Sequence, residues 1–430
     1  MSLCDIKIMN TEQIIAVAIF LLILAGIISE KFDITVLALT GAAAMVAFKI
    51  IPLNKVMSYV DFDTIAVLLG MMIIVAIFRK TGFFEYIAIY TAKICKGDSL
   101  KILFALGFIT ALFSAILDNV TTVLLMGPIT FYITRMLKVN PIPFVITEIF
   151  SSNIGGTSTL IGDPPNIMIG SAAGLNFAEF LIHQFPVAII ILIFTIIILY
   201  FLNKKHLFVE EDHKIAITKL NPNEKITNKK LLIKGFIVIF FVLLGFIFSD
   251  QIGLNAGAVA MIGAAIFLLI SKTPLETVIN DVEWTSILFF MGLFIMVGGL
   301  VQTGVITMIA NIIIRFGKSD PILLMLIMLW GSAIISSFLD NIPFVATLIP
   351  LILVMGKSGI DITPLWWAIS LGACLGGNGS LIGASANVVL SGISEREGYK
   401  ITFVDYLKIG FPLMIFSIII CTGYMLIIYR

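Results

Sequence analysis

The stretch GGTSTLIGDPPN, residues 155–166, returns near the end of the chain as GGNGSLIGASAN, residues 376–387. The two copies lie about 220 residues apart, which is the kind of fixed spacing that marks an internal repeat. Other pairs recur at almost the same spacing: Leu117–Asn119 with Leu339–Asn341, Thr81–Gly82 with Thr303–Gly304, and Phe185–Pro186 with Phe411–Pro412. The chain is therefore a duplication of one ancestral unit.

The composition around these motifs is that of a membrane protein. Of the 430 residues, 60% are hydrophobic and 12% are charged, which leaves too little polar surface for a soluble domain of this size. The net charge of +1 gives no reason to expect nucleic acid as a partner. The sequence shows no metal-ligand cluster, nucleophile–base pair or phosphate-binding loop, so an enzyme is not expected.

Each half contains the same series of apolar runs. They are 12–29, 34–52, 62–79, 102–116, 121–137, 144–170 and 186–203 in the first half, and 231–249, 253–271, 284–301, 322–338, 343–356, 365–393 and 409–428 in the second. About 20 apolar residues cross ~30 Å of hydrocarbon, so most runs are long enough to span a bilayer. We expect a first repeat at 12–203, a basic linker at 204–230 and a second repeat at 231–430.

Some runs carry interruptions that a simple membrane span would not have. An Asp-Asn pair separates the fourth run from the fifth, and glycines, prolines and asparagines divide the sixth. Irregular backbone is tolerated at membrane depth only inside protein or beside a watery cavity. We therefore expect an all-α polytopic fold in which each repeat has five transmembrane helices, one of them broken, plus a re-entrant hairpin. An odd number of crossings makes the repeats inverted.

The distribution of basic residues predicts an orientation. When the linker at 204–230 is placed in the cytoplasm and both termini outside, most of the Lys and Arg residues fall on the cytoplasmic side. The expected location is the inner (cytoplasmic) membrane, with lipids around a multi-pass protein.

Polar residues gather at the two hairpin tips and the two breaks, where half-helix ends expose free N–H and C=O groups that bind ions. The candidate contacts for a solute or ion are Asp118, Asn119, Thr121, Asp340 and Asn341 at the tips, Gly155, Gly156, Thr157, Thr159, Asp163 and Asn166 in the first break, and Gly376, Gly377, Asn378, Ser380, Ser385 and Asn387 in the second. A coupling sodium ion is expected at Asp118, Asn119, Asp340 and Asn341. No cofactor is expected beyond a bound sodium ion or proton.

The acids among these residues have two interpretations. An ionisable group in mid-membrane costs of order 3 kcal/mol and is a functional candidate by default. Alternatively, Asp118, Asp340 and Asp163 cap the helices that follow them. Glu148, which has no equivalent in the second half, is either a proton-relay carboxylate or an interfacial charge.

The motifs LDNVTTV, residues 117–123, and SSNIGGTSTLIGDPPN, residues 151–166, resemble those of the arsenite permease and NhaD-type antiporter branch of the ion transporter superfamily, and especially its P protein group. The resemblance covers nearly the whole chain. It implies elevator-type secondary transport by a homodimer. In the superfamily's dicarboxylate branch the tips carry Ser-Asn-Thr, so Asn119 and Asn341 match ligand contacts, whereas Asp118 and Asp340 replace serines and would repel a dicarboxylate.

The leading hypothesis is a secondary active transporter of a small inorganic or oxyanion-type solute such as arsenite, coupled to protons or sodium. The alternative is a sodium/proton antiporter that uses Asp118, Asp340 or Asp163. A dicarboxylate or citrate symporter and a P-protein-like anion channel are the further alternatives.

Overall fold

The computed structural model describes residues 9–29, 31–204, 207–317 and 320–429, and within these ranges all regular structure is helical. The main elements of the first half are α1 (Thr11–Ile28), α2 (Ile34–Ala47), α3 (Phe62–Arg79), α4 (Phe83–Ile94), α5 (Ser99–Ser114), α6 (Asn119–Leu137), α7 (Ile142–Thr157), α8 (Pro164–Ala173), α9 (Phe177–His183) and α10 (Phe185–Asn203). In the linker, α11 (Glu211–Thr218) lies against α6.

The second half contains a matching series. Its main elements are α12 (Lys229–Ile247), α14 (Ala256–Ser271), α16 (Trp284–Gln302), α17 (Val305–Gly317), α18 (Pro321–Ser336), α19 (Asn341–Lys357), α20 (Thr363–Gly376), α21 (Ser385–Arg396) and α22 (Phe403–Tyr429). Short helices fill the connections: η1 (Leu53–Tyr59), η2 (Pro222–Lys225), α13 (Ser249–Ile252), α15 (Leu275–Ile279) and η3 (Gly377–Gly379). In the described part of the chain, α1, α3, α6, α10, α12, α16 and α22 are long and apolar enough to cross a membrane.

The helices are interrupted at the positions where the sequence predicts an interruption. The chain reverses between α5 and α6 at Asp118, and between α18 and α19 at Asp340. The sixth apolar run of each half is two helices, α7 with α8 and α20 with α21. Pro164 and Pro165 occupy the first positions of α8, where a missing N–H is tolerated but the preceding helix cannot continue.

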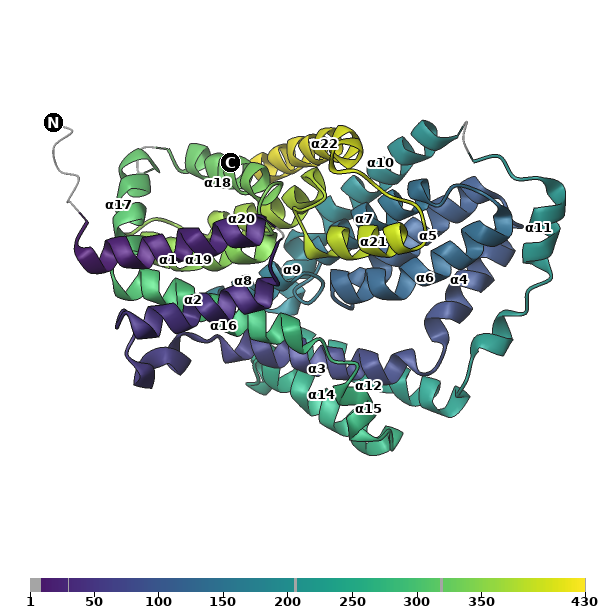
Figure 1. The fold of residues 1–430 in the computed structure, drawn as a ribbon, viewed down its shortest axis with the longest axis horizontal. Helices are drawn as coiled ribbons and strands as arrows, with labels where there is room; N and C mark the ends of the chain where they lie inside the picture. The colour runs from purple at the N-terminus through teal and green to yellow at the C-terminus, as the bar shows by residue number, and fades with distance from the viewer. Residues whose placement is uncertain (1–8, 30, 205–206, 318–319, 430) are drawn as a thin grey trace.

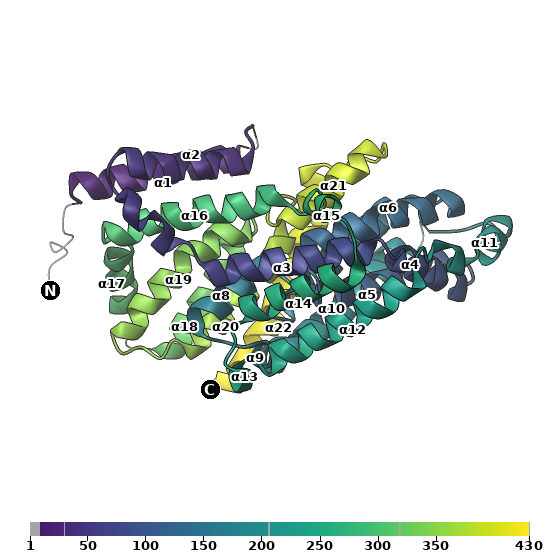
Figure 2. The same ribbon diagram turned by 90° about the horizontal axis from the view of Figure 1, so that it is seen from below.

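Two segments predicted only as connections are helices. These are α4, which follows α3, and α17, which follows α16. Figures 1 and 2 place α4 and α17 at opposite ends of the molecule. Each packs on a hairpin of its own half, α4 on α5 and α6, and α17 on α18 and α19.

Most close packing falls within two groups of helices. The frame group consists of α1, α2, α3, α12, α14 and α16, in which α3 packs on α14 and α2 on α16 (Figure 1). The hairpin group consists of α5 to α8, α10 and α18 to α22, in which α5 packs on α7 and α18 on α20. Each group therefore takes helices from both halves of the chain.

Glycines allow the closest approaches within each group, and they occur in pairs. A Cβ on Gly155 would lie 2.2 Å from the Ala111 carbonyl oxygen, and one on Gly376 would lie 2.6 Å from the Ala333 carbonyl oxygen. In the frame group, Gly70 and Gly292 approach the backbones of α14 and α2 in the same way. The helix contacts of the first half thus recur in the second.

Candidate transport site

A cavity of about 360 Å³ lies between the frame group and the hairpin group. The frame group contributes residues of α2, α3 and α16, and the hairpin group contributes the first residues of α6, α8, α19 and α21. The residues lining it from these four half-helices are Asp118, Val120, Leu124, Pro164, Ile342, Ser385 and Val389. Four helix starts from distant parts of the sequence therefore meet at one hollow in the apolar region.

Behind the cavity, an asparagine network joins both halves of the chain. Asn153 of α7 donates to the side-chain oxygens of Asn378 and Asn387, at 2.9 and 2.8 Å. Asn119 of the first tip donates to the Asn153 side-chain oxygen at 3.2 Å. All four side chains are buried. Buried amides joined in this way hold the first tip against both broken helices.

Two further hydrogen bonds fix the backbone of each break, and they are equivalent in the two halves. Asn166 donates to the Thr159 carbonyl oxygen at 2.9 Å, and Asn387 donates to the Ser380 carbonyl oxygen at 2.9 Å. The Thr159 hydroxyl in turn donates to the Ala115 carbonyl oxygen at 2.6 Å, and Ser380 donates to Ser337 at the matching place. These contacts satisfy free carbonyl groups in the two breaks and at the ends of the hairpin helices α5 and α18.

Asp163 is buried at the start of α8 and makes no side-chain bond to that helix. Its carboxylate oxygens accept from the Asn341 amide, both at 3.3 Å. Asn341 lies at the second hairpin tip, so this contact ties that tip to the first break. The capping alternative for Asp163 is therefore not what the structure shows.

Asp118 and Asp340 do cap the helices that follow them. Asp118 accepts from the Thr121 backbone N–H at 2.7 Å and from the Thr121 hydroxyl at 2.5 Å. Asp340 accepts from the Ile342 backbone N–H at 3.0 Å and from the Ser385 hydroxyl at 2.7 Å. Both side chains are only partly buried. The positive starts of α6 and α19 are thus matched by the chain's own carboxylates.

Glu283, which the sequence interpretation did not select, faces the same cavity from the start of α16. Burial and the nearby Asp118 carboxylate raise the pKa of Glu283, while a hydrogen bond from the Ser286 hydroxyl, 3.2 Å away, opposes the shift. Asp33 adds a third carboxyl group to the lining. The cavity is therefore acidic.

A second hollow of about 240 Å³ continues along α3 toward the C-terminal end of that helix. It shares Met72, Leu124 and Glu283 with the first cavity and reaches Arg79 and Asp281. The two hollows together follow α3 from its middle to its last residue. The site therefore has an approach at the Arg79 end.

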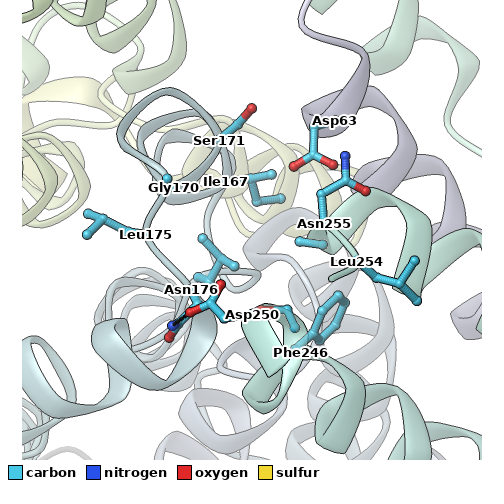
Figure 3. A pocket seen from close by; sticks show the side chains of 14 residues that line it. Asp63, Ile167, Gly170, Ser171, Leu175, Asn176, Phe246, Asp250, Leu254 and Asn255 are labelled. Atoms are coloured by element: carbon cyan, nitrogen blue, oxygen red, sulfur yellow. Dashed lines mark hydrogen bonds between the residues drawn. The ribbon is translucent and has the colours of Figure 1, made fainter. Parts of the chain in front are cut away.

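At the opposite end of α3 the two groups are joined by a hydrogen bond. The Ser171 hydroxyl of α8 donates to the Asp61 carboxylate at 2.9 Å. A separate pocket of about 150 Å³ lies here, with Asp63 beside Asn255 at one end and Asn176 bonded to Asp250 at the other (Figure 3). No residue of this pocket lines the central cavity.

The predicted site residues divide into three sets. Asp118 and Ser385 line the central cavity and Thr121 lines its continuation. Gly155 and Gly376 pack against α5 and α18. The others lie in or beside the network behind the cavity: Asn119, Gly156, Thr157, Thr159, Asp163, Asn166, Asp340, Asn341, Gly377, Asn378, Ser380 and Asn387.

Asn153 and Glu283 are the residues that sequence reasoning missed. Asn153 lies within the SSN motif just before the first break, so its place beside a broken helix was a usable signal. Glu283 precedes α16 as Asp61 precedes α3, at the spacing of the repeat. That correspondence marks a position but does not reveal that Glu283 faces Asp118.

Apolar helices that surround paired half-helices, with the helix starts meeting at a cavity, define a multi-pass membrane transporter. Residues 24–372 match the family described as citrate transporter. The chain belongs to that family, within the ion transporter superfamily that its motifs resemble.

Similarity to known transporters supports this assignment. An uncharacterised transporter of Mycobacterium tuberculosis is 40% identical over 97% of this chain and 99% of its own length. The P protein of Mus musculus is 33% identical over 96% of this chain and 60% of its own length. The solved YdaH transporter of Alcanivorax borkumensis is similar with a TM-score of 0.55 over 97% of this chain and 98% of that one, at 13% identity, which shows the fold alone. The chain is therefore a secondary transporter of the membrane and not an enzyme.

Proposed function

We propose that this protein moves a small inorganic or oxyanion-type solute such as arsenite, coupled to protons or sodium, by sliding the hairpin group against the frame group. The observation that carries the proposal is the cavity lined on one side by the frame group and on the other by the starts of four half-helices. A solute held there touches both groups, so movement of one group past the other changes its surroundings.

The arrangement along α3 supports alternating access. The hollow extends to Arg79 at one end, whereas at the other end the Asp61–Ser171 contact joins the two groups and the hollow does not reach it. With basic residues on the cytoplasmic side, the Arg79 end faces the cytoplasm and this conformation is inward-open. Sliding the hairpin group would break the Asp61–Ser171 contact and expose the site to the outer side.

The charge of the cavity favours a neutral or cationic ligand. Asp118, Glu283 and Asp33 line it, and the backbone N–H groups at the starts of α6 and α19 already bond Asp118 and Asp340. A carboxylate solute would meet like charges at low dielectric constant. Arsenite near neutral pH is largely the uncharged hydroxide, which needs hydrogen-bonding partners such as the Ser385 hydroxyl.

A coupling sodium ion is proposed at the hairpin tips, where Asp118, Asn119, Asp340 and Asn341 supply oxygen ligands of the kind that sodium prefers. Sodium/proton exchange is the second candidate, and the facing carboxyl groups of Asp118 and Glu283 favour it. Two nearby acids that cannot both ionise easily are suited to exchange one cation for another. Citrate is the third candidate, because the family is described as citrate transporter.

The architecture that accompanies this function is an inverted repeat, with residues 12–203 and 231–430 on either side of the linker at 204–230, of which residues 205–206 lie outside the described part. Equivalent contacts in the two halves support the repeat, among them the Gly155–Ala111 and Gly376–Ala333 approaches. The protein is proposed to be a homodimer in the inner membrane, in contact with lipids through its frame group.

Flux in proteoliposomes tests the proposal. Arsenite, sodium and citrate are presented in turn under an imposed pH or sodium gradient. We expect uphill accumulation of arsenite, and its loss in Asp118→Asn with the folded protein retained. Asp212→Asn, a change in the exposed linker helix α11, is the matched control and keeps the flux. Accumulation of citrate alone would overturn the proposal in favour of the third candidate, and proton movement on addition of sodium alone in favour of the second.

A further inference from the structure

Glu148 is a buried acid in the middle of α7 that the central cavity does not reach. Its side chain is 1% exposed, and it does not line the cavity or its continuation. One carboxyl oxygen, Oε1, accepts from the Thr130 hydroxyl of α6. The other, Oε2, is buried and has no hydrogen-bond partner. Glu148 therefore has one donor for two oxygens.

The other acids of the hairpin group are better matched. Asp118 and Asp340 each accept from a backbone N–H and a hydroxyl, and Asp163 accepts from an amide at both oxygens. A buried carboxylate without compensating donors is strongly disfavoured relative to the neutral acid. Of the four acids, Glu148 is the one with a buried oxygen that lacks a hydrogen-bond partner, which favours its protonated form.

No charge compensates Glu148 from the helices packed on α7, which are α5, α6, α10, α20, α21 and, through the stacking of Tyr406 on Phe150, α22. In the described part of the chain no basic side chain forms an ion pair with it. Several titratable groups on those helices bond elsewhere: Lys101 with Asp98, Arg135 with Glu397, Glu395 with Lys400, Lys408 with Asp405, Cys374 with Asn166, and Tyr424 with the His183 carbonyl oxygen. The remaining ones, Tyr132, Tyr200, Tyr406, Cys421 and Tyr429, form no hydrogen bond to Glu148 in the described part of the chain. Arg396, the last residue of α21, makes no bond to Glu148.

Glu148 lies between the asparagine network and the C-terminal part of α6. It lies five residues, or about 7.5 Å along the helix, before Asn153, which holds the asparagine network together. On the other side, Thr130 is followed one turn later by Thr134, whose hydroxyl donates to the Thr130 carbonyl oxygen at 2.8 Å. Two buried hydroxyl groups, those of Thr130 and Thr134, thus lie one turn apart on α6 beside Glu148.

The second half does not repeat this feature. When Gly155 is matched with Gly376, the place of Glu148 is taken by Ile369, which is buried and apolar. The tips and breaks occur twice, but this acid occurs once. A proton bound here gives one protonation per chain rather than one per repeat.

We propose that Glu148 is the binding site of the coupling proton, separate from the solute site. The carboxylate takes one proton from water on one side of the membrane through Oε2, travels as the neutral acid with the hairpin group, and returns the proton to water on the other side. The ionised form opposes movement because a carboxylate without compensating donors is strongly disfavoured at membrane depth. This inference rests on the proposed function only for its link to transport.

Proton binding by purified protein tests the site without any solute. Proton uptake is measured with a pH dye between about pH 9 and about pH 6, where ordinary carboxylates stay ionised. Glu148→Gln is expected to take up one proton fewer per chain than the wild type. Glu276→Gln is the matched control, because Glu276 is an exposed glutamate of α15, and uptake by this variant should equal that of the wild type. Equal uptake by Glu148→Gln and wild type overturns the proposal.

Transport of arsenite then tests coupling. In Glu148→Gln we expect pH-driven accumulation to fall at least tenfold while arsenite exchange at equal pH stays within about threefold of wild type. Retained accumulation overturns the coupling role, and loss of exchange together with accumulation places Glu148 in the solute site instead. If Glu148→Gln does not fold, Glu148→Asp is measured instead, because its shorter side chain loses the hydrogen bond from the Thr130 hydroxyl. Coupling should persist with a shifted pH profile, and an unchanged profile contradicts the proposal.

Discussion

Asn341 and Asp163 meet at the centre of the hairpin group, where the Asn341 amide lies 3.3 Å from both carboxylate oxygens of Asp163. One residue comes from a hairpin tip of the second half and the other from a break in the first half. Both side chains are buried. The two halves are therefore joined at the proposed cation site by a contact that neither half could make alone.

Asn341→Ala should weaken this junction. Removal of the amide leaves the Asp163 carboxylate buried without its donor, at a cost of about 1.5–3 kcal/mol. We expect lower thermal stability in detergent and loss of gradient-driven flux. Asn54→Ala, a change on the exposed helix η1, is the control and should leave both unchanged. Wild-type stability and flux in Asn341→Ala would show that the contact contributes nothing.

Gly155→Ala should separate α5 from α7. The added Cβ would lie 2.2 Å from the Ala111 carbonyl oxygen, so the helices must move apart at a cost of about 1–3 kcal/mol. Gly423→Ala in α22 is the matched control, because its Cβ meets nothing within 4 Å. Thermal unfolding followed by size-exclusion chromatography should show a loss in the first variant alone. Equal behaviour of the two variants would contradict the packing role.

Glu283→Gln should flatten the pH dependence of sodium binding. Because burial and Asp118 raise the pKa of Glu283, this acid loses its proton at higher pH than an ordinary glutamate. The cavity then becomes more negative, and sodium should bind more tightly as pH rises from about 6 to about 8. Glu283→Gln stays neutral and should lack this rise. Glu276→Gln, an exposed residue of α15, is the control. Parallel pH profiles of sodium binding in Glu283→Gln and wild type would show that Glu283 does not affect the cation site.

Labelling from each side of the membrane tests the inverted repeat. Lys96→Cys and Lys357→Cys introduce exposed thiols next to a hairpin in the first and second half, in a background without the native cysteines. We expect an impermeant maleimide to reach Lys357→Cys from outside and Lys96→Cys only after the membrane is opened. Lys318, which lies outside the described residues, is a less suitable position. Labelling of both variants from one side would refute the inversion.

The fold could be predicted where the sequence breaks a strong pattern. Glycine pairs and Pro164–Pro165 interrupt long apolar runs, so the two broken helices were evident from residues 155–166 and 376–387. The helices α4 and α17 were missed because a search for long apolar runs passes over short helices that are apolar on one side only.

The site could be predicted less completely. The tips and breaks can be recognised in the sequence because polar residues interrupt apolar runs there. Two of the residues predicted on this basis, Asp118 and Ser385, line the cavity. Glu283 was missed because it lies just outside an apolar run, where a carboxylate is ordinary. It meets Asp118 only because the start of α16 and the tip of the first hairpin line one cavity in the folded chain. Contacts of this kind depend on tertiary structure and leave no local signal.

The central claim is that the hairpin group slides against the frame group. A cross-link between Asp61→Cys and Ser171→Cys tests it most directly, because the native side chains meet at 2.9 Å across the two groups. Gly245→Cys with Val259→Cys is the control pair, since a Cβ on Gly245 of α12 would lie 3.7 Å from the Val259 Cβ of α14 within the frame group, away from the central cavity. The account predicts that cross-linking the first pair stops arsenite flux, that reduction restores it, and that cross-linking the control pair leaves flux intact. Undiminished flux through protein cross-linked at positions 61 and 171 would contradict the account.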